Sequence, residues 1–378
     1  MEVGKNGGTD DAIQGEWNTT DKHDVAAIFY TSGTIGKRKG VMLSQENMME
    51  DINFGAKNIS SDGNTLSVLP FHHTFGLLTG LFALFYYECT IFICSSIKNL
   101  KRDMLAASPK MIMAVPIFIE SFYKTIRQTA LQQGKEQKMR IAIAISNFLL
   151  RIGVDIRKCL FSSILARFGG KLEYIVCGGA PLQVKYIRVF RAIGIEILNA
   201  YGITECSPGV AISRNFYHKD GSVGQIIKGC VVRIQNSEIQ VQGKNVMLGY
   251  YQDEEASMEA FDDGWFKTGD LGYVDRDGFL YVTGRTKNLI ILSNGENVSP
   301  EELENLLLDY DQVKEVVVYA ENGAITAEVF PSLDEGFEEQ IQNVVDVCNR
   351  KLPAYKRIQR LKIRQTEFPK TTTQKIKR

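Results

Sequence analysis

The residues best suited to hold an anion lie in one short loop. Residues 30–40, Tyr-Thr-Ser-Gly-Thr-Ile-Gly-Lys-Arg-Lys-Gly, follow an apolar run at 25–29 that predicts a buried strand. Glycine lets backbone N–H groups approach an anion closely, hydroxyls donate hydrogen bonds to it, and cations neutralise its charge. The spacing is not that of a P-loop, because Arg38 follows Lys37 where a hydroxyl is needed. A solvated turn is the alternative, but adjacent cations would repel one another there, so we expect a phosphate site.

Two further segments place polar residues after predicted strands. Gly178-Gly179 follows a strand predicted at 174–176, and Tyr201-Gly202-Ile203-Thr204-Glu205 follows one predicted at 196–198. Ligands of open α/β sheets bind at the carboxyl ends of the strands, so we expect these segments and the 30–40 loop to converge on one ligand. Tyr201 offers a flat face for a base, Thr204 a hydroxyl for phosphate, and Glu205 an oxygen ligand for Mg²⁺. A simple turn and a solvated glutamate are the alternatives.

Two charged residues stand apart from these segments. Asp270 ends the segment 265–270, and a carboxylate is the usual acceptor for ribose hydroxyls in dinucleotide sites. A turn cap is the alternative for Asp270. Lys375 lies in a hydroxyl-rich tail, and taken alone it predicts a solvated surface lysine.

The elements that must position these residues follow an alternating pattern. Predicted strands at 66–70, 90–94 and 111–115 alternate with predicted helices at 76–87 and 99–107, which indicates an α/β sheet with mostly parallel strands. Residues 117–168 read as helical and residues 222–284 as β-rich. Ser299-Pro300-Glu301-Glu302 predicts a capping box at the start of a helix, and Ser44 predicts a cap for the helix that follows it.

One predicted helix carries an apolar stripe, and one apolar stretch resembles a buried helix. The stripe consists of Ile141, Ile145, Phe148, Leu149 and Ile152. We interpret it as core packing, with a tunnel for an apolar ligand as the alternative. The stretch 77–87 is too short to span a membrane, so we expect a buried helix there and no integral membrane span.

Composition excludes several classes of protein. The formal net charge is zero, which argues against a general nucleic-acid binder, so the basic tail at 356–378 is interpreted as a solvated face. Seven cysteines without a CxxC pair and four histidines disfavour a disulfide framework and a zinc site. We expect reduced, buried cysteines in a cytoplasmic protein, because the polar residues 1–24 contain no signal peptide.

Taken together, these segments resemble the adenylate-forming superfamily of acyl-CoA synthetases, non-ribosomal adenylation domains and luciferases. The matching motifs occur in the family's order and are Thr-Ser-Gly-Thr at 31, Pro-Phe-His-His at 70, Gly-Gly-Ala-Pro at 178, Tyr-Gly-Ile-Thr-Glu at 201, Thr-Gly-Asp at 268, Gly-Arg-Thr-Lys at 284 and Lys375. The His-His-Thr-Phe-Gly segment and residues 293–302 are most similar to long-chain fatty acyl-CoA synthetases. The segment near His73 lacks the aspartate usual for amino-acid substrates, which counts against such a substrate.

The resemblance implies an α/β fold like that of acetyl-CoA synthetase. It comprises a large N-terminal α/β domain with a β-rich subdomain at 25–284 and a small, mobile α+β domain at 285–378, after a polar segment at 1–24. It also implies an AMP-forming ligase that converts a medium- or long-chain fatty acid and ATP into acyl-AMP and pyrophosphate, with Mg²⁺, and then transfers the acyl group to CoA. Acyl carrier protein is the alternative acceptor.

The resemblance also implies a role for each matching residue. The phosphate loop would be Thr31, Ser32, Gly33, Thr34 and Lys39; the nucleotide pocket Gly178, Gly179, Ala180, Tyr201 and Gly202; and the ribose site Asp270 and Arg285. Thr204 would contact the α-phosphate, Glu205 would bind Mg²⁺, and His73 would lie beside the acyl carboxylate. Lys375 would bridge the carboxylate and the α-phosphate, and Lys287 would be the hinge on which the small domain rotates between the two half-reactions.

The sequence departs from the family pattern in several places. Ile35 and Arg38 replace the usual threonine and proline of the loop, and Gln374 replaces the glycine before Lys375. The family's usual N-terminal segment, which supplies sheet strands and part of the acyl-side wall, has no counterpart in residues 1–24. We therefore also consider a companion polypeptide that supplies this segment, and a non-catalytic nucleotide-binding fragment or split-enzyme subunit.

Overall fold

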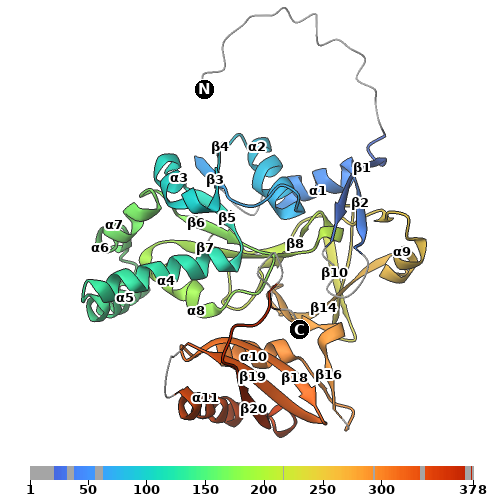
Figure 1. Cartoon of the computed structure of the whole chain (residues 1–378). Coiled ribbons are helices and arrows are strands. Elements are labelled where there is room, and N and C mark those ends of the chain that lie inside the picture. Colours follow the sequence, from blue (N-terminus) through green and yellow to red (C-terminus); the bar gives the residue numbers. More distant parts are fainter. Residues whose placement is uncertain are drawn as a thin grey trace, which may run out of the picture.

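A computed structural model of the chain describes residues 21–31, 38–55, 63–215, 217–292, 294–332, 337–370 and 376. Figure 1 shows a large domain that contains the N-terminal and middle parts of the chain, with a smaller domain, coloured orange to red, below it. The large α/β domain and small C-terminal domain match the fold class expected from the sequence. Among the described residues, no helix is both long and apolar enough to cross a membrane.

The central sheet of the large domain has the strand order β4-β3-β5-β6-β7-β8-β9. Its strands are β3 (Asn64–Ser67), β4 (Thr90–Ile93), β5 (Met111–Ala114), β6 (Tyr174–Cys177), β7 (Glu196–Gly202), β8 (Gly209–Ile212) and β9 (Gln225–Ile226). The pairs from β4 to β7 are parallel, as the alternation of strands and helices predicts, whereas β8 and β9 add antiparallel pairs.

Each central strand of this sheet is buried on both faces. In β5, Ile112 and Ala114 belong to a core formed with helices, whereas Met111 and Met113 belong to a second core shared with the β-rich part of the domain. Successive side chains of a strand point to opposite faces, which explains the split. A strand buried on both sides needs a continuous apolar run, and residues 111–114 supply one.

Helices flank the sheet and connect its strands. They are α1 (Gln45–Gly55), η3 (Phe75–Ala83), α2 (Leu84–Tyr86), η4 (Ile97–Asn99), α3 (Leu100–Ala107), α4 (Pro116–Gln132), α5 (Glu136–Arg151), α6 (Arg157–Leu160), α7 (Ser162–Leu165), η5 (Ala166–Phe168), α8 (Val184–Ile193), η6 (Thr204–Cys206) and α9 (Glu254–Ala260). The Ser44 cap is confirmed, because its hydroxyl accepts from the Asn47 N–H at 3.1 Å and the Asn47 amide oxygen accepts from the Ser44 N–H at 2.8 Å.

Two antiparallel sheets complete the large domain. One joins β10 (Cys230–Gln235), β11 (Glu238–Gly243), β13 (Phe261–Asp262), β14 (Trp265–Val274) and β15 (Leu280–Arg285), in agreement with the β-rich prediction. The other has the order β1 (Val25–Tyr30), β2 (Gly40–Ser44), β12 (Gly249–Tyr250). The prediction of a buried strand at 25–29 is wrong, because Val25 and Ile28 are exposed and Phe29 is the buried residue of β1.

The small domain packs two helices on a mixed sheet. Its elements are η7 (Thr286–Asn288), β16 (Ile290–Ile291), β17 (Asn297–Val298), α10 (Pro300–Leu308), β18 (Val313–Glu321), β19 (Ala324–Pro331), α11 (Phe337–Lys351), η8 (Ala354–Lys356) and β20 (Arg360–Ile363). Pro300 does occupy the first turn of α10, but the predicted capping box is wrong. The Ser299 hydroxyl makes no cap hydrogen bond and instead donates to the Thr283 carbonyl of the large domain at 2.8 Å.

Three predictions about burial are also wrong. The stripe on α5 does not face the core, because Ile141, Ile145, Phe148 and Ile152 are exposed. The helical stretch at 77–87 buries Leu78 and Leu84 but leaves Phe82, Phe85 and Tyr86 exposed, because only one side of it packs on the sheet. We expected buried cysteines, but Cys159 is exposed and Cys89 and Cys94 are only half-buried.

Candidate functional site

A cleft of about 3140 Å³ lies between the large and the small domain. Its walls come from the ends of β5, β6 and β7, from β14 and β15, and from α10 and β18 of the small domain. The two domains also touch directly beside it, because Lys185 Nζ donates to the Leu308 carbonyl at 2.7 Å and Arg127 lies 3.4 Å from the Asp311 carboxylate. The cleft therefore collects side chains from segments that are far apart in sequence.

Most of the residues singled out from the sequence line this cleft. They are Thr31, Lys39, His73, Gly178, Gly179, Ala180, Tyr201, Gly202, Thr204, Glu205, Asp270, Arg285 and Lys287. Ser32, Gly33, Thr34 and Lys375 lie outside the described residues. Lys370 and Ile376, on either side of Lys375 in sequence, line the cleft and pair with each other in an isolated antiparallel bridge.

The base of the 30–40 loop closes the turn between β1 and β2. The Thr31 N–H donates to the Lys39 carbonyl at 3.0 Å, and the two strands pair in antiparallel fashion. The expectation that this loop lies at the carboxyl end of the main sheet is therefore wrong, because β1 belongs to a separate sheet. Thr31 and Lys39 nevertheless line the same cleft as the strand ends of the main sheet.

Lys39, Tyr250 and Glu205 form a chain of contacts on one wall. Lys39 Nζ lies 4.5 Å from the centre of the Tyr250 ring, and the Tyr250 hydroxyl donates to a Glu205 carboxylate oxygen at 2.9 Å. Burial raises the pKa of Glu205, while the hydrogen bond from Tyr250 and the nearby cations Arg285 and Lys39 act in the opposite direction. Tyr250, which reaches the site from β12, was missed at the level of sequence because no motif marks it.

The turn that carries Glu205 is fixed by its own backbone and by α1. A Cβ on Gly202 would lie 1.9 Å from the Pro208 carbonyl oxygen, so no larger residue fits there. The Asn245 amide donates to the carbonyls of Cys206 and Gly209 at 3.1 and 2.7 Å. Asp51 of α1 accepts from the Gly209 N–H at 2.9 Å, and burial raises the pKa of Asp51 to about 8. Asp51 and Asn245 were missed because a buried polar residue has no periodic signature.

Asp270 is the meeting point of three elements. It is buried in β14, where one carboxylate oxygen lies 2.9 Å from Arg285 Nε of β15. The other oxygen accepts from the Tyr201 hydroxyl of β7 at 2.8 Å. Burial, together with the Asp270 charge, raises the pKa of Tyr201 well above its ordinary value, so this hydroxyl stays protonated as a donor.

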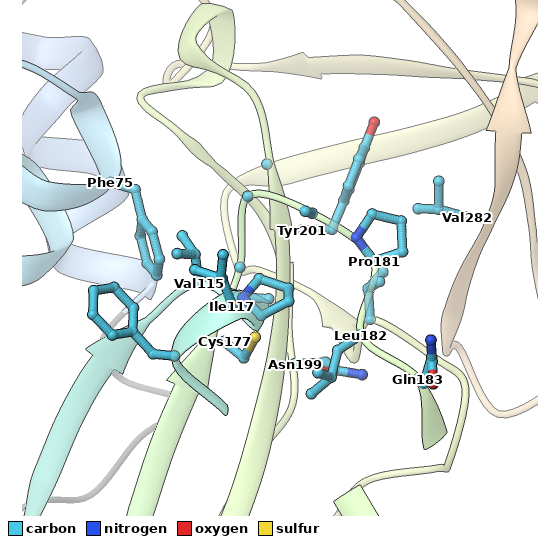
Figure 2. A pocket seen from close by; sticks show the side chains of 18 of the residues that line it. Phe75, Val115, Ile117, Cys177, Pro181, Leu182, Gln183, Asn199, Tyr201 and Val282 are labelled. Atoms are coloured by element: carbon cyan, nitrogen blue, oxygen red, sulfur yellow. The ribbon is translucent and has the colours of Figure 1, made fainter. Parts of the chain in front are cut away.

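Pro181 and Val282 lie near Tyr201 on the wall of the cleft. Figure 2 shows the Tyr201 ring and Pro181 close together, with Val282 projecting toward them from β15. Gln183 also lines the cleft, and its buried side-chain oxygen has no hydrogen-bond partner among the described residues. Apolar and aromatic side chains, with an unpaired acceptor in the same cleft, suit a flat base that carries an amino group, so the residues present fit a purine nucleotide.

A second branch of the cleft is apolar. It runs along η3, α2 and β5, and none of its described lining residues between positions 75 and 118 carries a charge. Phe75, Val115 and Ile117 lie along this side in Figure 2. His72 and His73 line the cleft just before this branch, with ring centres 4.3 Å apart. The cleft therefore joins a polar, charged end to an uncharged one.

Two family profiles match the chain. The profile described as "AMP-binding enzyme" matches residues 3–251, and the profile described as "AMP-binding enzyme C-terminal domain" matches residues 287–378. The chain belongs to the AMP-binding enzyme family.

Curated relatives in the AMP-binding enzyme family include CoA ligases. The long-chain-fatty-acid–CoA ligase FadD15 of Mycobacterium tuberculosis is 35% identical over 334 residues, which cover 83% of this chain and 55% of the relative. A 2-succinylbenzoate–CoA ligase of Listeria innocua is 28% identical over 372 residues, covering 95% of this chain and 70% of the relative. The chain thus spans about half the length of the first of these relatives.

A solved structure supports the same fold. The o-succinylbenzoate CoA synthetase (MenE) of Bacillus subtilis, in complex with ATP and magnesium ion, has a TM-score of 0.71 and 26% identity, covering 94% of this chain and 70% of that chain. Mg²⁺ is commonly bound by one or two carboxylates together with substrate phosphates. The Glu205 carboxylate, in a cleft that also holds Lys39 and Arg285, fits such an ion.

Proposed function

We propose that this chain is an ATP-dependent, AMP-forming acyl-CoA ligase that activates a medium- or long-chain fatty acid. The observation that carries the proposal is the continuity of the cleft between the polar wall of Glu205, Asp270 and Arg285 and the uncharged branch along η3, α2 and β5. A molecule that reacts there must present an anionic, hydrogen-bonding part at one end and an apolar part at the other. A fatty acid meeting ATP has this arrangement.

The nucleotide is held at the polar end. Its adenine lies between Gly179, Ala180 and Tyr201, and its ribose hydroxyls bind Asp270 and Arg285. Asp270 is buried and already oriented by two partners, so little side-chain entropy is lost when it accepts from the ribose. Thr31, Ser32, Gly33, Thr34 and Lys39 bind the β- and γ-phosphates.

The residues at the α-phosphate stabilise negative charge as it develops. Thr204 donates to a phosphate oxygen, and Lys375 bridges that phosphate and the acyl carboxylate, with His73 beside the carboxylate. Glu205 holds Mg²⁺, which when bound neutralises charge on the phosphate oxygens. Fixed donors and cations in a site screened from water act more strongly than they would in water.

We base the choice of an aliphatic acid on the lack of charged side chains among the described residues of the apolar branch. Succinylbenzoate carries a second carboxylate, which a buried site would have to pair with a cation or a hydrogen-bond donor. The described lining between residues 75 and 118 offers no cation, whereas it offers Met111, Met113 and Val115 to an alkyl chain. An aliphatic acid is therefore the better fit.

The small domain acts in both half-reactions. We place the boundary between residues 284 and 285, with residues 25–284 as the nucleotide-binding domain and Lys287 as the hinge. Lys287 lies in the short helix η7 and lines the cleft, at the first turn after β15 leaves the large domain. Rotation there exchanges the face that carries Lys375 for one that admits CoA.

ATP–pyrophosphate exchange tests the first step. We expect exchange with saturated fatty acids of medium and long chain, and little with 2-succinylbenzoate or amino acids. Exchange that is equally fast with 2-succinylbenzoate would overturn the acid class. No exchange with any carboxylate by folded protein that still binds ATP would instead support a non-catalytic nucleotide-binding subunit, particularly if a companion polypeptide restored turnover.

Acceptor transfer is measured separately. Preformed acyl-AMP is given to the protein with either CoA or acyl carrier protein, and the thioester is quantified. The CoA-ligase names of the curated relatives support CoA as the acceptor. Thioester formation on carrier protein alone would overturn that part of the proposal and leave adenylation intact.

A further inference from the structure

Helix α5 exposes a continuous apolar face. Ile141, Ile145, Phe148 and Ile152 are 59%, 47%, 62% and 60% exposed. At 100° per residue, these positions fall within a narrow sector of the helix surface. Figure 1 shows α5 at the outer edge of the large domain. Scattered exposed apolar residues are ordinary, but a stripe of four on one helix needs a physical reason.

The helix is nevertheless firmly attached by its opposite face. The Ser146 hydroxyl is buried and donates to the Ala192 carbonyl at the end of α8 at 2.9 Å. Met139, Ala142 and Ile143 pack against the helical core of the large domain. The orientation of α5 is therefore set by packing, and the apolar stripe is held outward.

Cations border the apolar stripe on both sides. On the helical projection, Lys138 lies on one side of it, and Arg140 and Arg151 lie on the other. The one acidic residue of the helix, Glu136, lies 3.9 Å from Arg127. In the described part of the chain, no ion pair involves Lys138, Arg140 or Arg151 within 4 Å. The face thus combines exposed apolar side chains with cations that have no carboxylate within 4 Å among the residues the structure describes.

The segments that precede and follow α5 in sequence also expose apolar side chains. Leu131 near the end of α4 is 50% exposed, and Val154 after α5 is 44% exposed. Leu131 also lines the cleft.

We propose that the outer face of α5, defined by Ile141, Ile145, Phe148 and Ile152 with Lys138, Arg140 and Arg151, docks the protein on the surface of a bilayer that contains anionic lipids. An amphipathic helix with apolar residues on one face and cations beside them lies in the plane of the interface and buries its apolar face among the acyl chains. The cations then meet lipid phosphates at the depth of the headgroups.

A second copy of this chain fits the same face less well. A symmetric dimer through α5 would place the two sets of cations against each other, with Glu136 as the acid available on the helix. Like charges brought together in a partly buried interface are destabilising. An anionic surface has the complementary charge, so the lipid is the occupant that the charges favour.

Vesicle co-sedimentation tests the proposal. The full chain is mixed with vesicles of phosphatidylcholine alone, or of phosphatidylcholine with phosphatidylglycerol. We expect binding to the anionic vesicles that weakens with added salt. Ile145→Gln with Phe148→Gln should lower the partition coefficient roughly tenfold or more, since two apolar side chains no longer insert. Lys138→Gln with Arg140→Gln and Arg151→Gln should remove the preference for anionic lipid.

Met258→Gln with Ile291→Gln is the matched control, because these side chains are 73% and 75% exposed on other elements. Binding that falls equally in the control, or that is unchanged in the α5 variants, would overturn the proposal. So would the absence of vesicle binding by the parent chain. Unchanged ATP affinity and thermal melting of the variants would exclude misfolding as the cause of a loss.

A spectroscopic variant gives a second readout. Phe148→Trp places an indole on the stripe, and its difference spectrum relative to the parent should shift to shorter wavelength on vesicle addition and be quenched by brominated lipid. An indole that remains exposed to water would contradict insertion. Sedimentation velocity without lipid tests whether a second copy of the chain occupies this face instead. A dimer in the parent chain that is lost in Ile145→Gln with Phe148→Gln would assign the face to a second copy and overturn the proposal.

Discussion

Asp270 and Arg285 face each other in the register of strands β14 and β15, and their side chains form a 2.9 Å ion pair on the wall of the cleft. The pair is completed by Tyr201, whose hydroxyl reaches the second oxygen of Asp270 from the main sheet. The β-rich sheet and the central sheet are thereby joined at one carboxylate. A ligand that binds Asp270 therefore contacts a residue whose position depends on both sheets.

Replacing Asp270 tests the ribose assignment. Asp270→Ala should weaken ATP binding at least tenfold, because the ribose loses its acceptor and both Arg285 and the Tyr201 hydroxyl lose a partner. Titration calorimetry with a non-hydrolysable ATP analogue measures the change. Asp277→Ala is the control, since that carboxylate is exposed and pairs with Lys219 away from the cleft. Unchanged nucleotide affinity in Asp270→Ala would remove Asp270 from the site.

Glu205→Gln tests the metal assignment. The amide can still accept from Tyr250 but carries no charge for Mg²⁺, so adenylate formation at saturating ATP should fall roughly a hundredfold. Raising the Mg²⁺ concentration should not restore it. Tyr250→Phe should cost much less, because the carboxylate remains. An equal loss in both variants would point to a structural role for Glu205 instead of a metal-binding one.

The pH dependence of the first step should reflect the same residue. Burial raises the pKa of Glu205, and only the deprotonated carboxylate binds the ion. Adenylate formation should therefore rise with pH through a limb that lies above the usual range of a glutamate. The limb should be present in the parent chain and missing in Glu205→Gln. A limb that persists in that variant would have to be assigned to another group.

Lys375→Ala separates the two half-reactions. Acyl-AMP formation should fall strongly, because a cation that spans the carboxylate and the α-phosphate is lost, while thioester formation from preformed acyl-AMP should be retained. Each half-reaction is measured alone, with pyrophosphate release for the first and thioester yield for the second. Lys377→Ala, a change of the same kind two residues away, is the control. Equal losses in both half-reactions would contradict the proposed role.

Asp51 should make stability depend on pH. Its pKa is 3.8 as an ordinary value and about 8 in the folded chain, because burial disfavours the charged form. Between these values the unfolded chain loses a proton that the folded chain keeps, so the free energy of unfolding should fall as pH rises, by a few kcal/mol in all. Asp51→Asn keeps an acceptor for the Gly209 N–H and should remove that component. Identical denaturation profiles across pH in both proteins would show that Asp51 is not the group responsible.

Much of this fold could be predicted from local patterns in the sequence. The apolar run at 111–114 and the alternation of strands and helices predicted the parallel sheet, because each pattern reflects the periodicity of its own element. The polar residues after β6 and β7 were found for a related reason, since parallel strands end at the same edge of a sheet. Asp270 and Arg285 were predicted as site residues through the family resemblance, because no local pattern distinguishes them from turn residues.

Other features depended on which surfaces pack together. The sequence by itself determined that residues 141–152 form an amphipathic helix, but the apolar stripe faces outward because the core contact is made through Ser146 and its neighbours. The sequence also determined that a helix starts at Pro300. Only the tertiary structure decided that the Ser299 hydroxyl donates a hydrogen bond to the Thr283 carbonyl instead of capping that helix. Periodicity is a property of one segment, while burial and hydrogen-bond partners belong to pairs of segments, and only the folded chain brings those pairs together.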